Sequence, residues 1–172
     1  MSISLYDVSV RSFLQSLEGA VGFLEKGAAF CREKGIDPQE VVETRLFPDM
    51  LPFSFQVISI AHHSMGAIEG VKAGLFGVST AGGLDYAGLQ ALVAQARSGL
   101  QALTPDEVNA LEGRDVLFQI GEFKMPFTAE NFLMSFSLPN LHFHATTAYD
   151  ILRMKGAPLG KRDYMGTPRI KM

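Results

Sequence analysis

The chain has 172 residues, of which 47% are hydrophobic and 19% are charged, and its formal net charge is −3. A chain of this length and apolar content can bury a core of its own, so we expect residues 1–172 to form a single domain. The negative charge argues against nucleic-acid binding, which requires clustered Lys and Arg side chains. The basic residues of GKRDYMGTPRIKM are expected to belong to a solvated tail over about 157–172, with a phosphate-binding arm as the alternative.

The N-terminal residues MSISLYDVSVRSF contain no basic stretch followed by an apolar stretch, so they do not resemble a cleavable secretory signal. No apolar run approaches the roughly 18 residues that a membrane-spanning helix needs. These patterns predict a soluble, cytoplasmic protein without a membrane partner. The single cysteine, Cys31, excludes an internal disulfide bond and a Cys-x-x-Cys metal motif.

Apolar residues recur every three or four positions in the first part of the chain, which predicts helices packed along one face. The first long helix is predicted from Val10 to Cys31 and is expected to end at Gly35. Cys31 lies on the apolar line of this helix, so we expect it to be a small buried residue. A short helix is predicted to begin at Asp37, within the capping sequence DPQE.

The same spacing continues in the middle of the chain. A second long helix is predicted over about 50–74 and a third over about 86–103, followed by a short helix that begins in TPDE at 104–107. The glycine-rich segment 74–83, GLFGVSTAGG, lacks the GK[ST] ending and the preceding strand of a nucleotide-binding loop. We therefore predict that this segment is a plain connector.

From Asp115 to Phe127 the apolar residues alternate with period two, which predicts a small β-hairpin. Thr128 is a suitable cap for a fourth long helix over about 129–155, which Gly156 would end. The predicted fold class is therefore all-α. It is an up-and-down four-helix bundle with short extra helices and one small β-hairpin before the last long helix.

The sequence PNLHFHATTAY, at 139–149, contains two of the four histidines, His142 and His144. On a regular helix His144 shares a line with Asn140 and Thr147, whereas His142 is turned roughly 200° away from it. We therefore predict that His144 points into the bundle and that His142 points outward or contacts another helix. The two histidines cannot serve one site while the helix stays regular.

Two neighbouring lines of residues are predicted to form the inward face of the fourth helix. One line contains Leu133, Ser137, Asn140, His144, Thr147, Ile151 and Met154, and the other contains Phe132, Phe136, Pro139 and Phe143. Pro139 has no N–H group and lies inside the helix, so we expect a kink that frees a carbonyl group near Ser135 and shifts the local helical phase.

A polar group in an apolar seam is stable only if it finds hydrogen-bond partners, and two interpretations of His144 stay open. In the first, His144 is a structural residue and the side chains of Asn140 and Thr147 form hydrogen bonds across the bundle. In the second, these residues line a ligand pocket. Gln56 and His63 of the second long helix are candidate facing partners, whereas His62 is predicted to lie on another side.

Ligand chemistry weighs against a complete metal site. Catalytic zinc normally takes three ligands from His, Cys or carboxylate groups, and the amides of Gln56 and Asn140 are poor substitutes. A Ser-His-Asp arrangement is also absent from the predicted inward line, because Asp150 does not share a line with His144. We therefore assign no metal ligand, cofactor or catalytic residue. A divalent metal such as zinc or nickel is the weaker alternative.

The stretch RLFPDMLPFSFQV at 45–57, together with PNLHFHATTAYDILRMKGAPLGKRDYMG at 139–166, resembles a bacterial family of unknown function in the DinB/YfiT-like superfamily, which includes metalloenzymes. This resemblance implies a DinB-like four-helix bundle that usually forms a homodimer. Metal-binding members of the superfamily use one histidine early in the second long helix and a His-x-x-x-His pair in the fourth. The matching positions here are Gln56, Asn140 and His144, so two of the three ligands are replaced.

We expect an uncharacterised DinB-like protein in which Gln56, Asn140, His144 and Thr147 line a degenerate metal site that binds a small molecule or is not catalytic. The first alternative is a metal-dependent transferase or hydrolase of the DinB/YfiT type, and the second is a structural homo-oligomer. We also expect a homodimer, from the resemblance and because the 13 phenylalanines exceed what one bundle interior readily hides.

Overall fold

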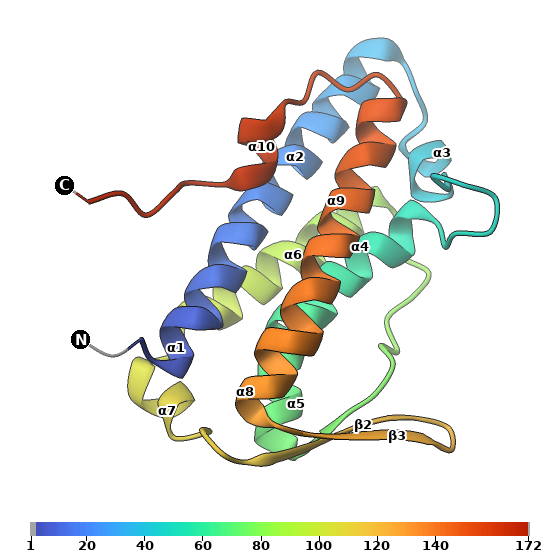
Figure 1. The fold of residues 1–172 in the computed structure, drawn as a ribbon. Helices are drawn as coiled ribbons and strands as arrows, with labels where there is room; N and C mark the ends of the chain where they lie inside the picture. Colours follow the sequence, from blue (N-terminus) through green and yellow to red (C-terminus); the bar gives the residue numbers. More distant parts are fainter. Residues whose placement is uncertain (1–2, 172) are drawn as a thin grey trace.

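A computed structural model describes residues 3–171, which are mostly helical and include a small three-stranded sheet (Figure 1). The long helical segments are α2 (Val10–Lys34), α4–η1–α5 (Phe53–Ala61, His62–Gly66, Ala67–Ala73), α6 (Tyr86–Gln101) and α8–η2–α9 (Ala129–Asn131, Phe132–Ser137, Leu138–Met154), where η marks a π-helix. The short helices are α1 (Leu5–Val8), α3 (Pro38–Val42), α7 (Pro105–Asn109) and α10 (Lys161–Met165). In this part of the chain no helix has both the length and the apolar character needed to cross a membrane.

The predicted ends of the first helices are confirmed. Gly35 has the left-handed conformation, with φ of 65°, and its N–H group donates to the carbonyl group of Cys31 at the end of α2. Glycine is favoured here because residues with a Cβ atom rarely adopt this conformation. The Asp37 carboxylate accepts a hydrogen bond of 2.9 Å from the backbone N–H of Gln39 and begins α3. Cys31 is buried, as predicted.

The predicted hairpin is also confirmed, and it belongs to a larger sheet. Strand β2 (Asp115–Ile120) pairs antiparallel with β3 (Phe123–Thr128) and parallel with β1 (Leu75–Phe76). The prediction that 74–83 is only a connector is therefore wrong at β1. A strand of two residues is too short to show an alternating pattern, and pairing with β2, far along the chain, defines it.

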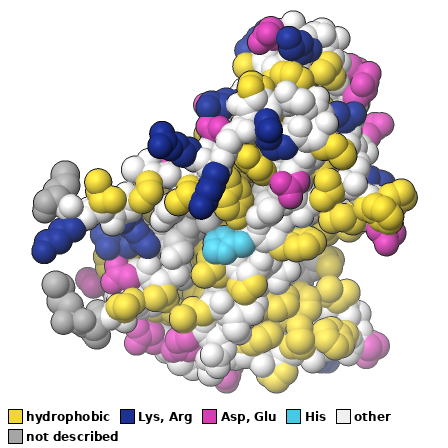
Figure 2. Space-filling model, turned by 45° about the horizontal axis from the view of Figure 1, so that its top comes forward, with side chains coloured by type: hydrophobic (Ala, Val, Ile, Leu, Met, Phe, Trp, Pro, Cys, Tyr) yellow, Lys and Arg dark blue, Asp and Glu magenta, His cyan; other side chains and the backbone are white. Residues whose placement is uncertain are grey.

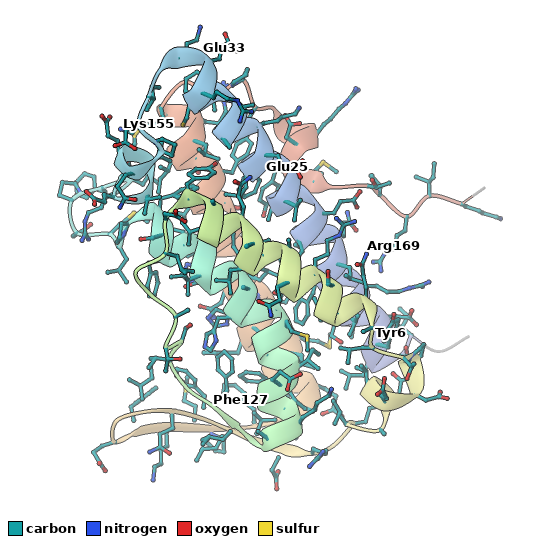
Figure 3. All side chains as sticks on the ribbon, turned by 180° about the vertical axis from the view of Figure 1, so that it is seen from behind. Tyr6, Glu25, Glu33, Phe127, Lys155 and Arg169 are labelled. Carbon is teal, nitrogen blue, oxygen red and sulfur yellow. The ribbon has the colours of Figure 1, made fainter. Side chains whose placement is uncertain are left out.

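The helices enclose an apolar core in which aromatic side chains fill much of the volume. Phe13, Phe23, Phe53 and Phe132 are fully buried. The ring of Phe53 stacks on that of Tyr86, with 5.7 Å between the ring centroids. The Tyr86 hydroxyl donates a hydrogen bond of 2.9 Å to the carbonyl group of Leu24, which ties α6 to α2. Phe127, labelled in Figure 3, lies in the hairpin at one end of the helices.

The C-terminal residues are not simply a solvated tail. Helix α10 packs against α2, and the Lys26 ammonium group lies 2.6 Å from the Asp163 carboxylate. Beyond α10, the backbone N–H and the hydroxyl group of Thr167 donate to the Glu18 carboxylate at 3.2 and 2.7 Å. The expectation of a solvated tail is therefore wrong for 161–167, and also for Ala157 and Leu159, which are buried. These contacts are made with a helix about 140 residues earlier, so no local pattern indicates them.

The predicted inward face of the fourth helix is only partly correct. Leu133, Ser137, Thr147 and Ile151 are buried as predicted. Three residues of the two lines are instead exposed, namely Pro139, Phe143 and Met154. The π-helix η2 lies between Phe132 and Ser137, and its wider turn changes which residues face the core on either side of it.

Candidate functional site

The second long helical segment contains a π-helical turn where its two histidines lie. In a π-helix the hydrogen bonds run from i to i+5, so one extra residue is accommodated and the helical phase shifts. The turn η1 brings both His62 and His63 to one cavity. The prediction that His62 lies on another side is therefore wrong. The Ser64 hydroxyl group donates a hydrogen bond of 2.7 Å to the Ile60 carbonyl group and satisfies part of the altered backbone.

A second π-helical turn precedes the other histidines. The irregularity expected near Ser135 is a π-helix, η2, which ends immediately before α9. Pro139 is the second residue of α9 and follows the π-helical turn directly. Within a regular helix, its missing N–H group would remove a backbone hydrogen bond. Helix α9 then continues regularly through Asn140 and His144. Both helices that supply the candidate residues thus contain a π-helical turn, a feature that frequently accompanies functional sites.

The candidate site is a cavity of about 280 Å³ between α4–η1, the segment that follows β1, strand β2 and η2–α9. Its walls are mainly aromatic and aliphatic, with a few polar groups. The aromatic walls are formed by Phe55, Phe76, Phe118 and Phe136, and the polar groups come from Ser59, His62, His63, Ser79, Asn140 and His144. Its lining includes no Asp, Glu, Lys or Arg side chain.

Gln56 determines the tautomer of His144. The Gln56 side chain is 2% exposed, and its Nε2 atom donates a hydrogen bond of 2.9 Å to the carbonyl group of Leu51. This bond turns the Oε1 atom of Gln56 toward His144, where it lies 2.7 Å from Nδ1. An amide oxygen only accepts hydrogen bonds, so Nδ1 of the neutral imidazole carries the proton. The Nε2 atom of His144 is therefore an acceptor.

The histidines of the cavity are held in the neutral form. Burial lowers the pKa of His63 to about 3, and the neighbouring imidazoles of His62 and His144 act in the same direction. Burial also lowers the pKa of His144 to about 4, with a smaller contribution from His62. The rings of His63 and His144 stack with 5.7 Å between their centroids and an angle of 16° between their planes. A proton on either ring would repel one on the other.

The Nδ1 atom of His63 is buried and has no hydrogen-bond partner within residues 3–171; the Oγ atom of Ser137 shares this property. Nearly all buried polar side-chain atoms in proteins form a hydrogen bond, so such an atom needs an explanation. The His63 ring forms part of the cavity wall, while its Nδ1 atom stays buried.

The other predicted site residues divide into two groups. Asn140 lines the cavity, and its Nδ2 atom donates a hydrogen bond of 2.8 Å to the Phe136 carbonyl group. The side-chain oxygen of Asn140 is not used in that bond. Thr147 is buried, donates to the Phe143 carbonyl group of its own helix at 2.8 Å and does not line the cavity. The structure thus places His144 and Asn140 at the cavity, with Gln56 bonded to His144 but outside the lining, and leaves Thr147 apart.

The sequence pattern does not indicate that His62, Phe76, Phe118 and Phe136 belong to the site. They come from η1, β1, β2 and η2, and only the packing of these elements brings them to one cavity. Two adjacent histidines at 62 and 63 are one indication of a site in the sequence. In a regular helix, however, their side chains would point about 100° apart. His142 is exposed, as predicted.

The donor groups of the cavity do not match a complete catalytic zinc site. The lining has three imidazoles, those of His62, His63 and His144, and the amide oxygen of Asn140. His62 is already bonded to the Gly77 carbonyl group, and the Gln56 oxygen is bonded to His144. Over residues 3–171 no three or more His, Cys, Asp and Glu side chains are grouped in a way that could hold a metal ion. Catalytic zinc sites normally use three such ligands, so the residues of this cavity do not fit a catalytic zinc ion.

Comparison with known proteins places this architecture in a family. The chain is similar to the crystal structure, at 1.83 Å resolution, of a DinB family member protein from Shewanella denitrificans. The two share 25% sequence identity with a TM-score of 0.79, over 98% of this chain and 95% of that chain. A comparison with curated proteins gave no match. The model of a family described as a domain of unknown function, DUF1993, matches residues 5–165. The predicted resemblance to a DinB-like family of unknown function is thus confirmed, and the chain belongs to the DUF1993 family.

Proposed function

We propose that this protein is a DinB-like helical bundle that binds a small, uncharged molecule in the cavity beside His144. The observation that supports this proposal is a pair of consecutive hydrogen bonds, from Gln56 to Leu51 and from His144 to Gln56. They orient the imidazole of His144 and leave its Nε2 atom as an acceptor. A ligand with an O–H or N–H donor matches this atom. The apolar part of such a ligand would contact the aromatic walls.

The remaining groups of the cavity support the same ligand chemistry. The oxygen of Asn140 is a second acceptor, and the His63 ring forms part of the wall. The lining includes no charged side chain, and the pKa values of His63 and His144 keep both rings neutral near pH 7. A cavity with apolar walls and a few oriented polar groups is the usual form of a small-molecule site.

We predict that His144→Ala weakens the binding of 1-butanol and phenol about tenfold, because one hydrogen bond to the ligand is lost. The change should also destabilise the fold by about 1–3 kcal/mol, because the buried Gln56 oxygen loses its partner. His142→Ala is the matched control, since His142 is exposed on the same helix, and it should change stability by less than about 0.5 kcal/mol. Binding is measured by titration calorimetry and stability by urea unfolding.

Two outcomes would contradict this proposal. Equal effects of His144→Ala and His142→Ala would show that the oriented imidazole does not contribute to binding. Stoichiometric zinc or nickel in protein purified without an affinity tag would favour the other candidate, a metal-dependent transferase or hydrolase of the DinB/YfiT type. His144→Gln, which retains a polar side chain, is the second variant if His144→Ala does not fold.

We further propose that the protein is a homodimer, on the basis of exposed apolar side chains. Large hydrophobic residues that are 40% or more exposed include Phe47, Phe55, Phe123 and Phe143. Hydrophobic side chains gather on part of the face shown in Figure 2. Covering such a surface with a second copy is favourable. Sedimentation equilibrium should give a mass near twice 18.7 kDa, and a single-chain mass at high micromolar concentration would refute the homodimer.

A further inference from the structure

A second cavity, of about 390 Å³, adjoins the candidate site on the other side of His62. It lies between α4–η1 and α6, and residues from the segment that follows β1 close it on the outside. Its walls are mostly apolar or small, and include Ala61, Met65, Leu92, Ala96 and Gly99. The exposed side chains of Glu69 and Gln95 also line it.

The two cavities share part of their walls. Ile58 and His62 of the helical segment line both, as do Ser79 and Ala81 of the segment above them. This segment, residues 77–85, runs along the outside of the helices from the sheet to the beginning of α6 (Figures 1 and 3). The boundary between the two cavities is thus formed by His62 and the overlying segment.

The overlying segment is held at this boundary by one side chain. The His62 ring nitrogen Nε2 lies 2.7 Å from the Gly77 carbonyl oxygen and donates a hydrogen bond to it. Within the described part of the chain, no other hydrogen bond joins residues 77–83 to the helices. The His62 ring also stacks on that of Phe76, with 4.2 Å between the centroids. A segment with so few attachments can move outward without disturbing the core.

The second cavity has the properties of a site for an apolar chain. Gly99 has no side chain, and a Cβ atom there would lie 3.1 Å from the Met65 sulfur atom. Met65 is half-buried, and the flexible thioether of methionine adapts to ligands of varied shape. The second cavity, at about 390 Å³, lies inside the usual range of about 300–1,000 Å³ for ligand sites, and the first, at about 280 Å³, lies slightly below it.

We infer that the two cavities are two parts of one binding site, and that its ligand is an elongated molecule with a hydrogen-bond donor at one end and an unbranched apolar chain at the other. The donor end binds beside His144 and Asn140. The apolar chain passes beneath Ser79 and Ala81 and lies between α4–η1 and α6 against Met65. This inference rests on the proposed function and adds to it the length and polarity of the ligand.

The test uses the 1-alkanols from butanol to decanol and measures their affinities by titration calorimetry. Each methylene that enters an apolar site increases affinity about threefold to fourfold. In the natural protein this increase should continue along the series. Ala96→Leu fills the second cavity, since Ala96 is 6% exposed on its wall, and should stop the increase at a shorter chain while leaving butanol affinity unchanged.

The matched control is Ala94→Leu, which places the same side chain on the exposed face of α6 and should behave like the natural protein. If Ala96→Leu does not fold, Gln95→Phe narrows the cavity from an exposed position. Identical chain-length profiles for the natural protein and the filled variant would overturn the inference. A failure of butanol to bind, or butanol binding that His144→Ala leaves unchanged, would instead refute the proposed function.

Discussion

Lowering the pH from 7.5 to 4.5 is expected to destabilise this protein by about 3 kcal/mol through His63 alone, since each pH unit below the unfolded-state pKa contributes about 1.36 kcal/mol. The pKa of His63 falls from 6.5 to about 3 on folding because the ring is buried. Between these values the unfolded chain binds more protons than the folded one, so stability falls as the pH falls. The full stability of the fold is present above about pH 6.5. His144, whose pKa is lowered to about 4, acts in the same direction.

The experiment is urea unfolding at several pH values between 7.5 and 4.5. Several carboxyl groups also have lowered pKa values, because they accept hydrogen bonds or lie near cations, and they contribute mainly below this window: Asp7, Glu18, Glu107, Glu130 and Asp163. His63→Phe keeps an aromatic ring among its neighbours and should remove the part of the pH dependence that His63 contributes, while the part from His144 remains. His142→Gln, at an exposed position, should retain most of the pH dependence. An unchanged pH dependence in His63→Phe would show that His63 is not buried in the neutral form.

Gly27→Ala is expected to destabilise the protein by about 2 kcal/mol, although alanine is more favourable than glycine within a helix by about 1 kcal/mol. A Cβ atom at Gly27 would overlap the Tyr86 hydroxyl group and lie 2.9 Å from the Leu152 Cδ2 atom. Overpacking a core typically costs about 1–3 kcal/mol. Displacing Tyr86 would also break its hydrogen bond to Leu24, which is worth about 1 kcal/mol.

Gly22→Ala provides the matched comparison in the same helix. A Cβ atom at Gly22 meets no neighbouring atom within 4 Å, so only the helix preference of alanine remains. We expect Gly22→Ala to stabilise the protein by about 0.5–1 kcal/mol. Urea unfolding of the two variants should therefore give changes of opposite sign. If Gly27→Ala stabilises the protein as much as Gly22→Ala does, the close packing of α2 against α6 and α9 is incorrect.

The sequence predicted the site best where a residue depends on its own helix. His144 was placed on the inward side of a helix and Gln56 opposite to it, and the structure joins them by a hydrogen bond. Thr147 shares a helical line with His144 yet does not reach the cavity, because a shared line extends over several turns and a cavity does not. His62 shows the opposite error, since a π-helical turn brings it to a site that a regular helix would not.

The sequence by itself determined where the long helices and the hairpin lie, that Cys31 is buried, and that the chain resembles a DinB-like family. These properties follow from apolar periodicity, caps such as Asp37 and Gly35, and motifs that are continuous in the sequence. Only the tertiary structure decided the π-helical turns, the pairing of β1 with β2, the docking of α10, and the two cavities around His62. The strand pairing, the docking of α10 and the cavities depend on contacts between residues far apart in the chain, and a local pattern carries no information about which distant side chains will meet. The π-helical turns change a helical phase that apolar periodicity assumes to be regular.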